Sequence, residues 1–289
     1  MTGPADPGGV TGLRRFRPAG VRDRNGGHRS TLIALGSTVV VFGLLLAVVL
    51  NSPGWPLIQK SFLNATYLAD SWPRQLEAIG TNVQLFLMAE VIILPVALLL
   101  AVLRSLPGPA FFPVRLLAVL YTDFFRGVPG VLIIFMLGFG MPTLGLPGVP
   151  IDPFFWGVVS LVLIYSAYVS EVYRAGIESV HPSQEAAARS LGLSRAQALR
   201  HVVLPQAVRR VIPPLLNDFI GLQKDTALVS FIGVVEVFRQ AQIDESASFN
   251  FTPYLATAAL FLLLTVPLAR LTDWLAARSR QRQLGGFAR

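Results

Sequence analysis

Residues 31–50 read TLIALGSTVVVFGLLLAVVL, a run of twenty residues without a charged side chain. An α-helix needs about 20 apolar residues to cross the roughly 30 Å of hydrocarbon in a bilayer. The run therefore predicts a membrane-spanning helix. The polar residues 1–30 are too long and too basic for a simple signal peptide, and no small-residue cleavage site follows residue 50. We therefore expect this helix to be retained.

Further apolar runs follow along the chain. They are residues 83–103, 116–140, 154–173, 211–238 and 254–275. Counting residues 31–50 as the first run, the third run (116–140) and the fifth run (211–238) are less regular because both contain charges and Gly or Pro. We expect Pro95 to kink its run and Pro213-Pro214 to interrupt 211–238. The sequence thus predicts an all-α, polytopic membrane helical bundle with about six transmembrane helices.

Composition supports lipid as the solvent of this chain. Charged residues make up 14% and hydrophobic residues 53%, whereas a soluble domain has roughly 25% charged residues. The absence of cysteine excludes a disulfide framework, an iron–sulfur cluster and a thiolate zinc site. The three histidines are scattered, so we expect no metal site. No catalytic Ser/His/Asp or Cys/His set is visible, and we expect no enzymatic activity.

The basic residues indicate how the chain is oriented. Nineteen of the 24 Lys and Arg residues fall within residues 1–30, 104–116, 174–210 and 270–289. With six spans these segments share one side of the membrane, and the positive-inside rule places them, with both termini, in the cytoplasm. Residues 1–30 and 276–289 are then basic cytoplasmic tails, and 51–80 is an external segment. The net charge of +8 reflects topology and contact with anionic lipid, so we expect no nucleic-acid partner.

The loop after the fourth run, residues 181–205, reads HPSQEAAARSLGLSRAQALRHVVLP. It predicts two short helices with a tight turn between them. We expect Ser183 to cap the first helix, and Ser194 with Gln197 to form a capping box on the second. Gly192 stands where a left-handed residue closes a helix. Pro205 marks the end of the second helix or a bend toward the membrane.

This loop resembles the EAA loop of ABC-importer permeases, whose pattern is Glu-Ala-Ala, three residues, Gly, nine residues, an aliphatic residue, one residue and Leu-Pro. Gly192, Val202 and Leu204-Pro205 match that spacing, but Ala186 takes the place of the motif's glutamate. Glu185 lies one residue early, which turns its side chain by about 100° around a helix.

Three other stretches are similar to segments of polar amino-acid permeases: YTDFFRGVP at 121–129, SAYVSEVYRAGI at 166–177 and KDTALVS at 224–230. The chain therefore resembles the permease subunits of histidine/glutamate/glutamine-type ABC importers over about residues 80–275. The resemblance implies a permease core at 81–275, a coupling loop at 178–208 and an additional amino-terminal helix at 31–50.

The resemblance also implies partners. A separate cytoplasmic ATPase dimer uses ATP, a second permease chain (identical or homologous) completes the channel, and an extracytoplasmic binding protein delivers substrate. This chain itself has no phosphate-binding loop, so we expect no bound cofactor. The expected location is the bacterial inner membrane. The residues expected to fit the ATPase are Glu185, Ala186, Ala187, Gly192, Leu193, Leu204 and Pro205.

Ionisable residues inside spans are costly and mark candidate substrate contacts. They are Glu90, Asp123, Arg126, Asp218, Lys224 and Asp225. Arg126 is a candidate for the carboxylate of an amino acid, and Glu90 or Asp123 for its ammonium group. The alternative is that these charges pair with one another near the membrane interfaces. Glu171 and Arg174 are expected to form a local i,i+3 pair.

Two other functions remain open at this level. A secondary transporter would use intramembrane carboxylates and an ion gradient, and a membrane scaffold would transport nothing. The sequence does not identify the amino acid.

Overall fold

The computed structural model describes residues 27–285, and every element in that range is helical. Most of the predicted tail at 1–30 lies outside the described residues, whereas residues 276–285 of the predicted tail at 276–289 continue the last helix, α11 (Thr252–Gly285). The chain divides into two units, residues 1–56 and 57–289.

The first unit contains α1 (Gly27–Leu50), which confirms the helix predicted at 31–50. Residues 30–50 are all exposed, and apolar side chains cover every face of the helix. A helix that is apolar all round and unburied by protein is typical of one surrounded by lipid. A short helix, α2 (Trp55–Phe62), follows and crosses the boundary between the units.

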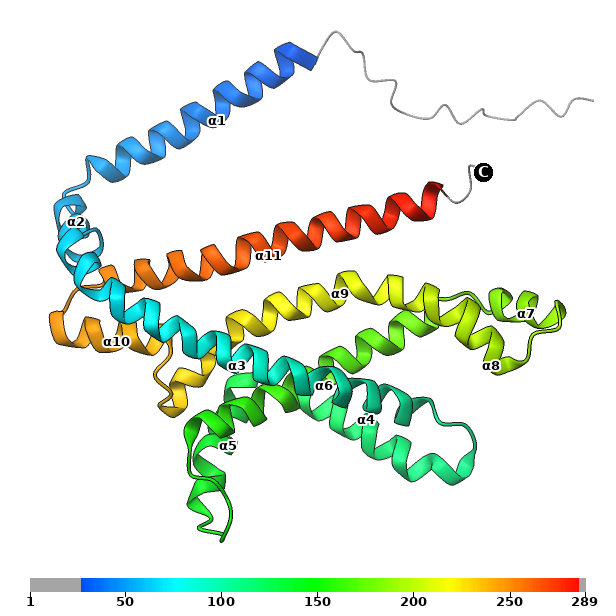
Figure 1. The fold of residues 1–289 in the computed structure, drawn as a ribbon. Coiled ribbons are helices and arrows are strands. Elements are labelled where there is room, and N and C mark those ends of the chain that lie inside the picture. The colour runs from blue at the N-terminus through cyan, green and yellow to red at the C-terminus, as the bar shows by residue number, and fades with distance from the viewer. Residues whose placement is uncertain (1–26, 286–289) are drawn as a thin grey trace, which may run out of the picture. The chain divides into compact units, whose positions relative to one another are not determined.

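In the second unit, α6 (Pro153–Glu178) is the central helix (Figure 1). It packs against α3 (Ala65–Ser105), α4 (Phe112–Gly127), α5 (Gly130–Thr143) and α9 (Leu204–Asp225). The core of this unit includes fully buried Leu85, Ile93, Ile134, Leu161 and Leu222. A Cβ at Gly176 would overlap the side chain of Val211, so this glycine lets α6 and α9 approach closely.

Helix α3 is longer than its predicted span at 83–103. It has 41 residues, which at 1.5 Å per residue gives about 60 Å, twice the thickness of the hydrocarbon. Residues 65–80 of the predicted external segment are the beginning of this helix, and Asn64 caps it. The helix runs on through Pro73 and Pro95.

The predicted span at 116–140 is two helices and not one. Helix α4 ends at Gly127, α5 begins at Gly130, and the two are bent by 103°. Val128 precedes Pro129 and has an extended backbone, as the proline ring requires of the residue before it. The proline therefore breaks the span at a defined point.

The predicted span at 211–238 is also broken, but not where the sequence suggested. Helix α9 continues through Pro213 and Pro214 and passes into a 3₁₀ turn, η3 (Thr226–Ile232). The break comes at Gly233, which has φ +95°, and α10 (Val237–Ser248) follows at a bend of 48°.

Buried Asn82 of α3 joins the parts on both sides of this second break. Its Nδ2 donates to Thr226 Oγ1 at 3.0 Å and to Glu236 Oε2 at 2.9 Å, and its Oδ1 accepts from Val237 N at 3.0 Å. Glu236, whose side chain is also buried, caps α10 by accepting from the backbone nitrogens of residues 238 and 239.

Within the described residues, four helices are long and apolar enough to cross a membrane, or six if each bent pair counts as one span. The last of the four lies in α11 (Thr252–Gly285). The prediction of about six spans therefore holds when the two bent pairs are each counted once.

The ends of the second unit agree with the distribution of arginines. In Figure 1 the turn between α3 and α4, the hairpin of α7 and α8, and the carboxyl-terminal end of α11 lie toward the same end of this unit. The basic segments 104–116 and 174–210 therefore share one side, as the positive-inside argument requires. The cytoplasmic placement of the two termini remains a prediction.

Candidate functional site

A helical hairpin forms the end of the second unit that carries the predicted coupling loop. It consists of α7 (Pro182–Ser190) and α8 (Arg195–Ala198). Gly192 has φ +91°, and Leu193 N donates to Ala188 O across the turn, which is the bonding of a left-handed helix closure. The predicted capping box of Ser194 and Gln197 is present in both directions. The predicted turn geometry is therefore confirmed.

One predicted detail of the hairpin is wrong, and one of the two alternatives for Pro205 is excluded. His181 and not Ser183 caps α7, because its Nδ1 accepts from Ser183 N and Pro182 fills the first helical position. Pro205 does not end the second helix either. A π-helical turn, η2 (Leu199–Val203), precedes it and leads directly into α9. The wider turn relieves the clash between a proline ring and the carbonyl four residues earlier.

The hairpin has a small core of its own. Ala188 and Ala198 are buried within it, and Val180, Val203 and Ala207 pack together at its base. The Arg210 side chain also bonds the Ser179 carbonyl where the hairpin meets α6. These contacts fasten the hairpin to the ends of α6 and α9.

The residues predicted to meet an ATPase lie mostly on the outer surface of this hairpin. Ala186, Ala187, Gly192, Leu204 and Pro205 are exposed, and Glu185 and Leu193 are half-buried. The Glu185 carboxylate lies 3.8 Å from Arg195 Nε, and the side chains are 40% and 82% exposed respectively. The outer surface of the hairpin therefore combines small residues with the large, 82% exposed side chain of Leu191 at the turn, and the displaced glutamate is paired with an arginine of the same hairpin.

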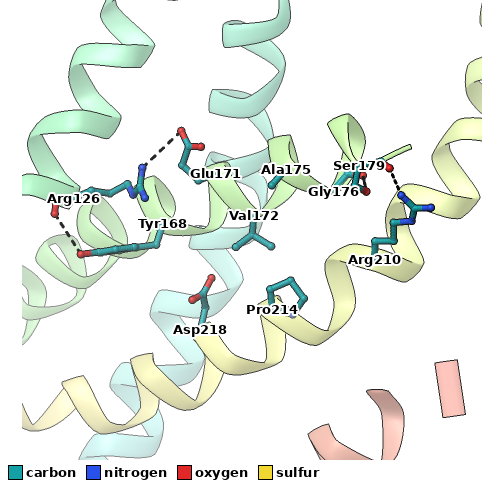
Figure 2. Close-up of a pocket in the computed structure, with 10 residues that line it drawn as sticks. All are labelled: Arg126, Tyr168, Glu171, Val172, Ala175, Gly176, Ser179, Arg210, Pro214 and Asp218. Atoms are coloured by element: carbon teal, nitrogen blue, oxygen red, sulfur yellow. Dashed lines mark hydrogen bonds and ion pairs between the residues drawn. The ribbon is translucent and has the colours of Figure 1, made fainter. Parts of the chain in front are cut away.

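A cavity of about 490 Å³ lies among α4, α6 and α9 (Figure 2). Its polar and charged lining residues include Arg126, Tyr168, Glu171, Arg210 and Asp218. Both signs of charge thus face one cavity, with Arg126 at the end of α4 and Asp218 on α9.

Arg126 lies between an aromatic ring and a carboxylate. Its guanidinium carbon is 5.8 Å from the centre of the Tyr168 ring, and its Nη1 is 3.9 Å from Glu171 Oε1. Its side chain is 42% exposed and lines the cavity, so part of the guanidinium remains accessible from the cavity.

Glu171 pairs with three arginines from three helices. The predicted i,i+3 pair with Arg174 is confirmed at 2.8 Å. Arg104, at the end of α3, also bonds Glu171 Oε1, and Arg126 is the third. Sequence reasoning missed this cluster because its members are far apart along the chain.

Asp218 is the acidic residue of the cavity. Its Oδ2 is buried and has no hydrogen-bond partner among the residues that the structure describes. The Glu90 carboxyl on α3 is close enough to interact electrostatically with Asp218, although Glu90 does not itself line the cavity.

The other predicted substrate residues lie elsewhere. Asp123 and Lys224 are exposed and do not line this cavity. Asp225 accepts a hydrogen bond of 2.8 Å from Tyr165 Oη, which ties the end of α9 to α6. Of the six ionisable residues named as candidate substrate contacts, Arg126 and Asp218 line the cavity, and Tyr168 and Arg210 join them there.

Known proteins share this arrangement of helices and hairpin. Residues 93–281 match the family described as binding-protein-dependent transport system inner membrane component. A probable amino-acid ABC transporter permease, PatM of Vibrio harveyi, is 35% identical over 213 residues, which cover 73% of this chain and 94% of PatM. A probable glutamine ABC transporter permease, GlnM of Bacillus subtilis, is 37% identical over 194 residues, covering 66% of this chain and 88% of GlnM.

A solved structure described as an amino acid ABC transporter with histidines is also similar. It has a TM-score of 0.69 and 32% identity, and the match covers 74% of this chain and 98% of that one. The family match spans well over half of the chain. The chain therefore belongs to the family of binding-protein-dependent transport system inner membrane components, the permease subunits of ABC transporters.

Proposed function

We propose that this chain is the permease subunit of an ATP-driven importer of polar amino acids, and that it couples to a separate ATPase through the hairpin at 181–205. The observation that carries the proposal is that one uninterrupted helical segment connects that hairpin to the wall of the cavity. From Arg195 the chain is helical through η2 and α9 to Asp225. The relatives named as amino-acid and glutamine permeases support the substrate class.

The hairpin is suited to receive a force from a protein partner. Its exposed surface carries Ala186 and Ala187 on α7 and Gly192 at the turn, and these small residues permit close approach of another surface. Its buried alanines and its bond from Arg210 to Ser179 keep it attached to α6 and α9. Because Arg210, Pro214 and Asp218 line the cavity from α9, a displacement of the turn moves a wall of the cavity.

The charges in the cavity fit an amino-acid zwitterion. Arg126 offers guanidinium donors to the α-carboxylate, a pairing that favours two parallel hydrogen bonds. Asp218, whose buried Oδ2 has no hydrogen-bond partner among the described residues, offers an acceptor to the ammonium group. Asp123, Lys224 and Asp225 have no contact with this cavity and are assigned no role in binding the zwitterion.

The proposal requires partners beyond this chain. They are a cytoplasmic ATPase dimer that binds and hydrolyses ATP, a second permease chain, an extracytoplasmic binding protein and the lipid of a bacterial inner membrane. This subunit itself is non-catalytic. An ion-coupled transporter or a scaffold is the competing function, and the family match favours the ATP-driven importer over both.

The deciding experiment is purification from native membranes in mild detergent, followed by reconstitution. We expect an ATPase subunit to co-purify and labelled amino acids to enter proteoliposomes only with ATP on the hairpin side. Uptake driven by an ion gradient without ATP would indicate a secondary transporter. Intact protein that repeatedly purifies without an ATPase would refute the importer assignment.

A further inference from the structure

Three guanidinium groups share one carboxylate at the edge of the cavity. Arg104 Nη1 bonds Glu171 Oε1, and Arg174 donates to Oε2 from Nε at 3.0 Å and from Nη2 at 2.8 Å. Both oxygens of Glu171 therefore have close partners before Arg126 is considered.

Arg126 is the partner that is held least tightly. Its Nη1 lies 3.9 Å from Glu171 Oε1, which is beyond hydrogen-bond distance. No guanidinium donor of Arg126 forms a hydrogen bond with any residue in the described part of the chain. The Tyr168 ring supports one face of the group, and its donors remain available to a ligand in the cavity.

Arg126 has several donors, but two carboxylates held close to it repel each other because both are negatively charged. A substrate carboxylate that binds it must compete with Glu171, which lines the same cavity. Arg104 in turn competes with Arg126 for the same oxygen, Oε1 of Glu171. When Arg104 bonds Glu171 tightly, Arg126 is therefore free to bind the substrate carboxylate. When Arg104 moves away from Glu171, Arg126 pairs with Glu171 instead and is less available to the substrate.

We propose that Glu171 is a positioning residue that competes with the substrate carboxylate for Arg126, with Arg104 setting the outcome of that competition. This inference rests on the proposed function. According to this proposal, Arg126 exchanges the substrate carboxylate for Glu171, and this exchange sets both the affinity of the cavity for substrate and the release of substrate from it. Because Arg104 ends α3, Arg126 ends α4 and Glu171 belongs to α6, relative motion of these helices drives the exchange.

The test measures binding to the purified permease–ATPase complex without its binding protein, and it measures uptake by the same complex in proteoliposomes with the binding protein added. Direct binding of labelled arginine, glutamine and histidine is measured first, and the amino acid that binds best is used for the variants. Glu171→Gln removes the competitor and is expected to tighten binding about two- to fivefold, the range for a partly exposed ion pair. It is also expected to lower the turnover of uptake, because release is slowed. Arg104→Gln is expected to weaken binding by a similar factor.

Opposite signs for these two variants distinguish competition from a structural role, which predicts that both weaken binding. Glu178→Gln is the matched control, because Glu178 bonds the same Arg174 at the surface but has no contact with Arg126. In the Arg126→Gln background the gain from Glu171→Gln should disappear. Should Glu171→Gln fail to fold, Glu171→Asp takes its place: the shorter side chain withdraws the carboxylate from Arg126 and is expected to tighten binding, and weaker or unchanged binding overturns the competition.

Each possible outcome bears on a different claim. Weaker or unchanged binding in Glu171→Gln overturns the competition, as does tighter or unchanged binding in Arg104→Gln. A wild-type complex that neither binds nor transports any of the amino acids counts against the proposed function instead.

Discussion

Replacing Asn82 by alanine is expected to lower the free energy of unfolding of this protein by about 2–4 kcal/mol. Its side chain is almost fully buried and makes three hydrogen bonds, to Thr226, Glu236 and the backbone nitrogen of Val237. A single such bond contributes about 0.6 kcal/mol on average between membrane helices and about 1 kcal/mol in general. Three bonds therefore give roughly 2–3 kcal/mol, and the buried nitrogen of Val237 left without a partner adds to the loss.

Equilibrium unfolding in mixed micelles with increasing sodium dodecyl sulfate measures this change. Asn217→Ala is the control, because Asn217 lies exposed on α9 and its replacement should alter the free energy by less than about 0.5 kcal/mol. Asn82→Asp should be at least as damaging as Asn82→Ala, because it places a second carboxylate against Glu236. If Asn82→Ala is as stable as the control, the network does not hold the break between η3 and α10 together.

Three further changes test the hairpin and its base. Gly192→Trp should abolish ATP-dependent uptake while the protein still inserts, since φ +91° is unfavourable for any other residue and the indole would cover the exposed turn; normal uptake contradicts the coupling role. Gly176→Leu should reduce the yield of folded protein in gel filtration, because even a Cβ there meets Val211, and a wild-type profile would rule out that close packing. Glu185→Ala should leave ATPase coupling within about twofold of wild type, because this carboxylate forms only an exposed pair with Arg195; loss of coupling would show that Glu185 replaces the motif glutamate.

The features predicted correctly depend on short stretches of sequence. The length and the uniformly apolar character of residues 31–50 are enough to predict α1. The left-handed turn at Gly192 and the capping box of Ser194 and Gln197 involve residues at most five positions apart. Local preferences of the backbone decide such features before the rest of the chain has any influence.

The features that were missed depend on contacts between distant residues. The Glu171 cluster brings Arg104 to a partner 67 positions away, and Asn82 reaches Thr226 across 144 positions. Nothing near either residue in the sequence indicates its partner. The continuation of α9 through Pro213 and Pro214 was also missed, because neighbouring helices can compensate for the backbone bonds that prolines remove.

The two spans that were hardest to predict supply two of the three walls of the candidate site, and α6 supplies the third. A transmembrane segment interrupted by proline, glycine and charges scores poorly as a straight helix, and both such segments here are broken. Irregular backbone at membrane depth is tolerated only where protein buries it or where it lines a cavity. The first break leaves Arg126 in the last turn of α4, in the wall of the cavity. The second is buried under Asn82 and Glu236. The charges, prolines and glycines that interrupt the apolar runs are therefore the residues that need a cavity or buried hydrogen-bond partners. The helical bundle supplies these, and lipid cannot.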